Sequence, residues 1–419
     1  MAQSPSESWD WRQHPDFLLN CVSRFGVTLA SQIQAVAIGW FIYATTESAL
    51  ALGIVGLAAF LPAILLMLVT GYASDRFDRR LVLSCCCSVM TLATAAQLLH
   101  VWSGIEDMWP LYLTVVLYGT GRAFYLPANS AILPNLVPQR HFGNAAAFTT
   151  AVAQAANISG PAVGGFLYAI SPMAAFGGAL TFYALAAASN YLIRYRSKPA
   201  PARGGVNRLE HLLAGFRFMW KMPVVLGAIT LDLFVVVLGG SVSLLPIFAK
   251  DILHVGPEGL GLLRSAPAIG ALLVGIVLAR NNFMQRKAGP RMFIAVMVFG
   301  FANLIFGLSS SFLLSFLVLA MMGAADTASV VVRVTLVQAE TPDELRGRVA
   351  AVSSLFTTFS NEIGQFRAGT MADFIGAVPA VVLGGAGAIA VAALWMRWFP
   401  ELGARDHLVP PEPGAAPGR

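Results

Sequence analysis

The sequence predicts an all-α membrane protein with twelve transmembrane helices, arranged as two pseudo-symmetric bundles of six. The first observation behind this prediction is composition, because 57% of the 419 residues are hydrophobic and only 11% are charged. Soluble domains carry about 25% charged residues, so this chain has too little polar surface to cover a soluble core. The second observation is that apolar runs of about 20 residues recur, the length that an α-helix needs to cross a bilayer.

The predicted spans follow one another along the whole chain. They cover residues 18–43, 49–71, 81–102, 110–132, 145–169, 173–194, 224–248, 260–279, 291–309, 312–335, 349–373 and 377–398. Gly (39 residues) and Pro (23 residues) occur within these runs, but transmembrane helices tolerate both better than soluble helices do. A transmembrane β-barrel would instead show alternating segments of about 10 residues, and the sequence has none.

The loops predict the orientation. Residues 1–16 lack the basic region and cleavage site of a signal peptide, so we expect the first span to be retained, with Trp9 and Trp11 at the membrane interface. If both termini lie on one side, every Lys and Arg of the loops and tails falls on that side except Lys250. Positive loops stay in the cytoplasm, which predicts two cytoplasmic termini. The net charge of +6 then reflects topology and indicates no nucleic-acid partner.

Internal repetition divides the chain in two. The halves match at an offset of 204 residues, which aligns Pro138 with Pro342 and Gly160 with Gly364. Parallel six-helix halves of this kind are a transporter architecture. The linker is expected to contain an amphipathic helix on the membrane surface. The predicted parts are a cytoplasmic segment (1–16), the first bundle (17–194), the linker (195–222), the second bundle (223–399) and a disordered cytoplasmic tail (400–419).

A cluster of charges interrupts the apolar pattern in "GYASDRFDRR", residues 71–80. The stretch resembles the signature between the second and third helices of the major facilitator superfamily: a glycine, three residues, Asp-Arg, two residues and a basic pair. The matching residues are Gly71, Asp75, Arg76, Arg79 and Arg80, whereas the superfamily usually has Gly where this chain has Asp78.

The resemblance implies that this loop is a cytoplasmic gate. Asp75 would accept hydrogen bonds at the N-terminus of helix eleven, where the helix dipole favours an anion, near Arg346 and Arg348. A tight loop of alternating charge can hold helix ends together in one state and release them in another. The alternative is a topology anchor, since the arginines alone would keep the loop inside.

Two further stretches support the resemblance. "ISGPAVGG" resembles the helix-five motif of the antiporters of this superfamily, through Gly160, Pro161, Gly164 and Gly165. "PDELRGRV", residues 342–349, resembles the loop before helix eleven in exporters of siderophores and macrolides, and the enterobactin-exporter branch is the most similar. For the glycines, close helix packing is an interpretation that stands beside a bend that seals one conformation against leak.

Polar side chains inside the spans predict the transport site. Charged residues at such positions cost about 2.5–3.5 kcal/mol each on insertion scales, so they usually face a cavity. Spans one, four, seven and ten carry them, and these are the spans that the resemblance places around a central cavity; span eleven adds a polar stripe. The candidate cavity residues are Arg24, Gln32, Tyr118, Arg122, Tyr125, Asn129, Arg333 and Asn361.

Three carboxylates are candidates for proton coupling: Asp326, Asp232 and Glu362. Arg122 and Asp326 occupy equivalent positions of the two halves, and we predict that they approach each other across the cavity. The carboxylate could then exchange a proton for an arginine partner as access alternates. A static ion pair is the alternative for each of the three.

These features predict a secondary active transporter that exports a small amphiphilic solute across the inner (cytoplasmic) membrane by alternating access, as a proton antiporter. The cavity candidates are slightly positive and include aromatic rings, which favours an anionic or catecholate, siderophore-like solute. Multidrug or macrolide efflux, lysophospholipid transport and a receptor that has lost transport are the alternatives.

Other energy sources and chemistries lack their motifs. The sequence has no Walker loop for ATP and no hydrolase or metalloprotease motif, so we expect neither an enzyme nor a cofactor. Consecutive Cys85, Cys86 and Cys87 point in different directions on a helix, and we expect apolar filler and no metal site. The expected partners are the solute, protons and the bilayer, and we expect a monomer.

Overall fold

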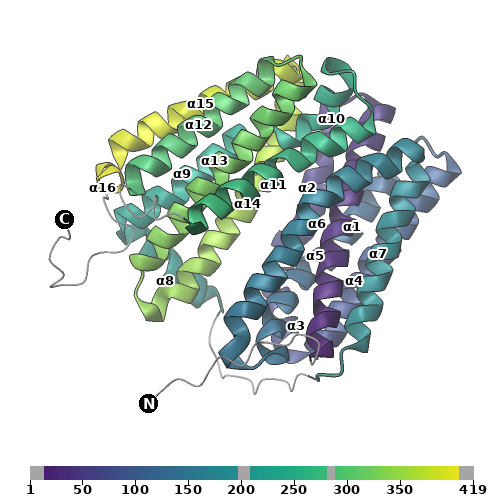
Figure 1. The fold of residues 1–419 in the computed structure, drawn as a ribbon, viewed down its shortest axis with the longest axis horizontal. Coiled ribbons are helices and arrows are strands. Elements are labelled where there is room, and N and C mark those ends of the chain that lie inside the picture. Colours follow the sequence, from purple (N-terminus) through teal and green to yellow (C-terminus); the bar gives the residue numbers. More distant parts are fainter. Residues whose placement is uncertain (1–13, 197–207, 281–287, 405–419) are drawn as a thin grey trace. The chain divides into compact units, whose positions relative to one another are not determined.

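The computed structural model describes residues 14–196, 208–280 and 288–404 (Figure 1). These residues are almost entirely helical and contain no β-strand. The predicted interfacial positions of Trp9 and Trp11 and most of the predicted tail lie outside the described residues. The all-helical fold predicted from composition is confirmed.

The first half of the chain forms helices near the predicted spans. They are α1 (Pro15–Thr46), α2 (Ala49–Leu65), α3 (Met67–Arg76), α4 (Arg79–Ser103), α5 (Trp109–Leu136), the short η2 (Gln139–His141), α6 (Phe142–Ile170) and α7 (Pro172–Leu192). The predicted second span is divided at Leu66, whose backbone leaves the helical region (φ −100°, ψ 3°). The break separates α2 from α3.

The second half repeats this series after a linker helix. Its helices are α8 (Arg208–Lys221), α9 (Pro223–Gly239), α11 (Pro257–Arg280), α12 (Ala288–Leu308), α13 (Phe312–Ala339), α14 (Asp343–Ile375), α15 (Ala377–Trp398) and the short α16 (Pro400–Gly403). The predicted seventh span is also broken. After α9 the chain continues through η3 (Val242–Leu244), α10 (Leu245–Ile247) and one π-helical turn, η4 (Phe248–Ile252).

Hydropathy and length identify eight of the described helical segments as candidate membrane spans. The helices α5, α6 and α14 are long enough to span a membrane, at 28, 29 and 33 residues, but they are less hydrophobic than these eight segments. Two of them, α5 and α14, carry polar residues that the sequence assigns to a cavity. Their lower hydropathy is therefore expected of helices that line a polar path.

The chain divides into two compact units. Unit 1 comprises residues 1–41 and 58–203, and unit 2 comprises residues 42–57 and 204–419. The division differs from the predicted boundary in one respect, because the end of α1 and the start of α2 belong to unit 2. The reason is close packing: a Cβ on Gly369 of α14 would lie 2.7 Å from the Ala49 carbonyl oxygen and 2.8 Å from the Cα of Gly53.

Glycine contacts repeat between the halves with the 204-residue offset. A Cβ on Gly160 would lie 2.6 Å from the Cβ of Gln32, and one on Gly364 would lie 2.7 Å from the carbonyl oxygen of Val236. Both members of the second pair are the positions of the first shifted by 204. The fifth and eleventh spans therefore pack against the first and seventh in the same way.

The linker helix α8 packs on protein. A Cβ on Gly215 would lie 2.8 Å from the carbonyl oxygen of Arg348 on α14, and the ring of Phe216 stacks on Phe356 with centroids 6.2 Å apart. Met219 is 1% exposed. The small and apolar residues of this face fit the side of α14, and the expected contact of α8 with the membrane surface stays a prediction.

Candidate transport site

Unit 2 contains a buried ion pair between α9 and α13. The carboxylate of Asp232 contacts the guanidinium of Arg333, and their side chains are 11% and 6% exposed. The Nε of Arg333 is buried with no acceptor among the described residues. Both residues were predicted to lie at the transport site, and the structure brings them together as partners. Buried charges persist in proteins when they are paired in this way.

A second cation, Arg367, stabilises the end of α9, where the predicted seventh span is interrupted. The last carbonyls of a helix have no intrahelical donor, and inside a membrane they need another partner. Arg367 of α14 donates to the Leu238 oxygen, and the amide of Asn303 on α12 donates to the Gly239 oxygen at 3.3 Å. The positive side chain of Arg367 therefore stabilises the interrupted helix.

Glu362 faces the segment of α2 that belongs to unit 2. It is 8% exposed, and one of its carboxylate oxygens would lie 3.9 Å from a Cβ on Gly56. Its neighbour Asn361 is exposed and donates to the Thr357 oxygen of its own helix at 2.8 Å. The adjacent residues thus differ, because Glu362 is buried in packing and Asn361 is exposed.

Asp326 lies on α13, seven residues before Arg333, and is half-buried. Among the described residues of its own unit, its carboxylate has neither a hydrogen-bond donor nor a cation as a partner. Asp326 and Asp232 therefore differ in kind, since only Asp232 is neutralised within unit 2. Arg122 belongs to unit 1, and its predicted approach to Asp326 stays a prediction.

The predicted cavity residues of unit 1 differ in exposure. Arg122 is exposed, whereas Arg24, Gln32, Tyr118 and Asn129 are half-buried. The amide of Gln32 donates to the side-chain oxygen of Asn157 on α6 at 3.0 Å, so it also holds two helices together.

Tyr125 is 5% exposed, and its hydroxyl is buried. The structure places this side chain in the interior of unit 1, beside Ser23 and Cys87. A solute could reach Tyr125 only if the helices of unit 1 separated. The other five residues need no such opening.

Sequence reasoning missed a polar network inside unit 1. Gln34 on α1 donates to Gln97 of α4 at 2.6 Å and to Thr94 at 3.2 Å, and it accepts from the hydroxyl of Tyr183 on α7 at 2.9 Å. The ring of Tyr183 lies 6.1 Å from that of Tyr118. One face of the network thus reaches a predicted cavity residue, and the rest fixes three helices together.

The basic pair of the charged loop binds within unit 1. Arg79 donates to the Ala131 oxygen on α5 at 2.8 Å, and Arg80 donates to the Ile193 oxygen at the end of α7 at 3.0 Å. The Ile193 contact lies at the C-terminus of α7, where cations are favoured because the carbonyls lack donors. These arginines therefore join α4 to its neighbours, and a gating role would come in addition.

Asp78, where the chain departs from the superfamily pattern, caps α4. Its side chain accepts a hydrogen bond from the Arg80 backbone N–H at 3.1 Å. An aspartate in this position satisfies a donor that the helix leaves unpaired. The departure from glycine is thus explained by local helix chemistry.

The rest of the predicted gate is only partly described. Gly71 and Asp75 lie on α3, and the guanidinium of Arg76 lies 5.7 Å from the ring centre of Tyr72. Arg346 pairs with Asp343, one turn away on α14, at 2.7 Å. Arg348 is in contact with α8, as described above. The approach of Asp75 to Arg346 or Arg348 joins different units and stays a prediction.

The glycine motif lies inside an uninterrupted α6. A Cβ on Gly164 would lie 2.8 Å from the Cα of Ile33, so α1 and α6 pack backbone against backbone at this point. Pro161 and Gly165 are buried beside it. This is the close packing that small residues permit in membranes. A leak-sealing role for the motif stays a prediction.

Four residues form a group that we call the Lys250 clasp: Tyr43, Glu47, Lys250 and Asp251. All four belong to unit 2. The ammonium of Lys250 lies 3.1 Å from the Glu47 carboxylate and 5.4 Å from the ring centre of Tyr43, whose hydroxyl donates to Asp251. Glu47 has a positive φ of 51°, a conformation that side chains disfavour. The clasp therefore ties α1 to the π-helical turn η4.

Comparison with known proteins decides the family. Residues 17–411 match the family described as transmembrane secretion effector. The chain belongs to this family. It is a multi-pass membrane transporter of the major facilitator superfamily, as the motifs predicted, and twelve spans in two bundles are consistent with that fold.

Relatives of this family member extend over its full length. It is 25% identical to the enterobactin exporter EntS of Citrobacter koseri, over 97% of both chains. It is 24% identical to the enterobactin exporter EntS of Shigella dysenteriae serotype 1, over 93% of both chains. The fold is similar to that of a bacterial homologue of the human lysosomal transporter Spinster, with a TM-score of 0.74, 16% identity and coverage of 95% of this chain and 99% of that one. It is also similar to a bacterial homologue of the iron transporter ferroportin, with a TM-score of 0.70, 17% identity and coverage of 95% and 100%.

Proposed function

We propose that this transporter exports a siderophore-like, anionic or catecholate solute across the inner membrane, in exchange for protons and by alternating access. The observation that carries the proposal is the similarity to enterobactin exporters, which extends over 97% of both chains. Both termini are proposed to be cytoplasmic, and Gly71, Asp75 and Arg76 are proposed to contribute to the cytoplasmic gate. The proposed transporter works as a monomer.

The distribution of cations supports an anionic solute. Arg333 is neutralised by Asp232, and Arg367 is engaged with the carbonyl at the end of α9. Arg24 and Arg122, which lie in unit 1, are the cations proposed to attract the solute. Tyr118, on the same helix as Arg122, offers an aromatic ring for stacking on a catechol.

The carboxylates differ in their suitability for carrying a proton. Asp232 is held by a buried arginine, so its protonation would leave that charge without a partner. Asp326 has no such partner among the described residues of its unit, and its protonation there breaks no hydrogen bond or ion pair with them. We therefore assign proton coupling to Asp326, with Asp232 and Glu362 as the weaker candidates.

Transport by the purified protein in vesicles tests the assignment. With a proton gradient and enterobactin as the probe, the wild-type protein should accumulate the solute against its concentration. Asp326→Asn should lose this uphill transport but keep downhill exchange, because a neutral side chain can bind no exchanged proton. Asp343→Asn, which alters a carboxylate that is 84% exposed, is the matched control.

Two outcomes separate the parts of the proposal. Uphill export by Asp326→Asn would place the coupling group elsewhere while leaving the substrate class intact. No export of enterobactin by the wild-type protein, and no loss of any catecholate from the culture supernatant of a deletion strain by mass spectrometry, would overturn the substrate class.

A further inference from the structure

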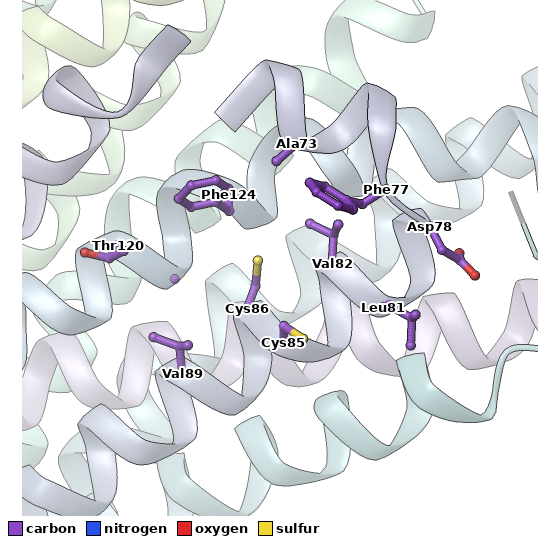
Figure 2. Close-up of a pocket in the computed structure, with 11 residues that line it drawn as sticks. Ala73, Phe77, Asp78, Leu81, Val82, Cys85, Cys86, Val89, Thr120 and Phe124 are labelled. Atoms are coloured by element: carbon purple, nitrogen blue, oxygen red, sulfur yellow. The ribbon is translucent and has the colours of Figure 1, made fainter. Parts of the chain in front are cut away.

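A pocket of about 420 Å³ lies in unit 1, between α3, α4 and α5 (Figure 2). The rings of Phe77 and Phe124 and the sulfur of Cys86 point into the same space in Figure 2. None of the residues that line the pocket was predicted as a cavity or gate residue. The pocket is lined by Ala73, Phe77, Asp78, Leu81, Val82, Cys85, Cys86, Val89, Thr120, Gly121 and Phe124.

The break between α2 and α3 helps to form this pocket. The helix stops at Leu66 and restarts as α3, which ends at the extended residue Phe77 (φ −100°, ψ 161°). On the other side, Gly121 lets α5 approach α4, because a Cβ there would lie 3.0 Å from the Cys86 carbonyl oxygen. Close packing of α4 on α5 therefore makes the floor, and the displaced α3 makes one wall.

The lining presents hydrocarbon and no free polar group. Its two hydrogen-bonding side chains already have partners: Asp78 accepts from the Arg80 N–H, and the Thr120 hydroxyl donates to the Val116 oxygen at 3.0 Å. A polar solute would lose its own hydrogen bonds on entering such a site. The pocket is therefore suited to an apolar chain.

The pocket opens on an exposed face of unit 1. Leu81, Cys85 and Val89 line the pocket and are spaced four residues apart, so they lie on one face of α4. Leu83, Cys87 and Met90, on the opposite face, are buried. Phe77 and Leu81 are 57% and 43% exposed. Apolar side chains that a membrane-spanning helix leaves exposed are suited to contact with lipid. The lipid chains themselves are thus the apolar molecules within reach.

A cation stands at the end of the pocket nearest the loop. Arg76 is the last residue of α3, three residues after Ala73 and directly before Phe77, and it is exposed. Its neighbours Arg79 and Arg80 are engaged with carbonyl oxygens, so Arg76 is the arginine of this loop suited to bind a phosphate. Basic residues beside transmembrane helices recognise anionic head groups.

We propose that this pocket binds one acyl chain of an anionic phospholipid from the surrounding leaflet, with the phosphate of its head group on Arg76. The chain would fill the space between α3 and α4 and fix α3, the helix that carries Asp75. The proposal is independent of the substrate proposed above. It requires only that unit 1 lies in a bilayer.

Lipid retention by the purified protein tests the proposal. The full chain, in nanodiscs of phosphatidylglycerol and phosphatidylcholine, is transferred to mild detergent, and bound lipid is measured by native mass spectrometry. Val89→Trp places a large ring in the pocket and should reduce retained lipid by about tenfold, equivalent to about 1.4 kcal/mol or roughly two displaced methylene groups. Leu92→Trp, on the same helix outside the pocket and 65% exposed, should retain lipid as the wild type does.

The head group is tested separately. Arg76→Gln should lose the preference for phosphatidylglycerol over phosphatidylcholine while still retaining lipid. Inorganic phosphate should not compete, because without an acyl chain the site offers one exposed cation. If phosphate displaced the lipid, the acyl pocket would be irrelevant to binding and the proposal would be wrong.

Cys85 provides a test on the folded wild-type protein. It is exposed, whereas Cys21, Cys86 and Cys87 are buried, so a bulky maleimide should react at Cys85. Alkylation should be several-fold slower in phosphatidylglycerol nanodiscs than in lipid-free amphipol, and alkylated protein should retain less lipid. Equal retention by Val89→Trp, Leu92→Trp and alkylated protein would overturn the proposal.

Discussion

Replacing Asp232 with Asn would leave Arg333 as an uncompensated charge inside unit 2. The arginine side chain is 6% exposed, and its Nε already lacks an acceptor among the described residues. Removing one partner of a buried ion pair costs about 3–5 kcal/mol. The folding equilibrium of Asp232→Asn should therefore fall by about a hundredfold to a few thousandfold.

A double variant that replaces both Asp232 and Arg333 separates two free energies: the cost of leaving Arg333 unpaired, and the contribution of the ion pair to stability. Well-packed apolar residues in place of a buried pair are often neutral or stabilising by about 1–4 kcal/mol. Asp232→Leu combined with Arg333→Met should therefore recover the stability that Asp232→Asn loses. The two substitutions should be strongly non-additive, as expected for residues in contact.

Unfolding of the purified protein measures both effects. Helicity is followed by circular dichroism as SDS is added to detergent micelles, and the midpoints of the variants are compared. Asp343→Asn is the control, because it breaks an exposed pair one helical turn apart, worth about 0.2–0.5 kcal/mol. A loss below about 1 kcal/mol for Asp232→Asn, or a double variant less stable than either single one, would refute the reasoning.

Three further predictions use the same unfolding measurement. Gly164→Ala should destabilise by about 1–3 kcal/mol through overpacking against α1, whereas Gly143→Ala, where a Cβ meets nothing within 4 Å, should not; equal effects would contradict the close approach. Asp78→Ala should cost about 1 kcal/mol through loss of the cap, and Asp78→Ser should cost less; the reverse order would exclude capping. In the clasp, Lys250→Gln should change stability by less than about 1 kcal/mol, since its carboxylate partner is 76% exposed. Tyr43→Phe, which removes a hydrogen bond to a carboxylate, should cost about 1.5–3 kcal/mol, and a larger effect at Lys250 would argue against this assignment.

The fold was predictable because lipid imposes a simple pattern. A spanning helix must satisfy its backbone internally and present apolar side chains outward, so length and hydropathy locate it. The break after Leu65 was harder to predict, because apolar residues continue across it. The break after Gly239 is followed by Gly240, Ser241 and Ser243, within an otherwise apolar run. The pair Gly239–Gly240 is a signal for the second break, but a glycine pair also occurs inside the unbroken α15, at Gly384–Gly385.

The transport site was predictable as a set of residues and less so as a set of contacts. Helical spacing placed Asp232 and Arg333 on polar faces, yet nothing local in the sequence says which charge meets which. The 204-residue offset equates Arg122 with Asp326, but equivalence between halves is a statement about descent and not about distance. The contact of Asp232 with Arg333 depends on how far two neighbouring helices rotate and slide, which packing determines.

The buried network around Gln34 shows the same limit. Gln34, Thr94 and Tyr183 lie on three helices and in runs that read as apolar. Each could be explained alone as a tolerated polar residue. Only their meeting satisfies the hydrogen bonds that burial requires, and a meeting between distant segments leaves no periodic trace in the sequence.

Duplication and charge together explain how the halves came to differ. The ion pair of unit 2, Asp232 and Arg333, corresponds under the offset to Thr28 and Asn129 of unit 1, which are polar but uncharged. Conversely, Arg24 of unit 1 corresponds to Ala228.

In its described residues, unit 2 therefore contains a neutralised pair and a carboxylate, Asp326, for which that unit supplies no partner, whereas unit 1 contains Arg24 and Arg122 among its predicted cavity residues. A carboxylate without a partner can gain a proton without breaking a bond. We infer that the two copies have divided the work: unit 1 recognises the anion, and unit 2 carries the proton. The double variant Thr28→Asp with Asn129→Arg would place in unit 1 the ion pair that unit 2 contains, and it should weaken binding of the anionic solute. If this variant bound the solute as the wild type does, the division would be wrong, because an added carboxylate would then not disturb a site that depends on cations.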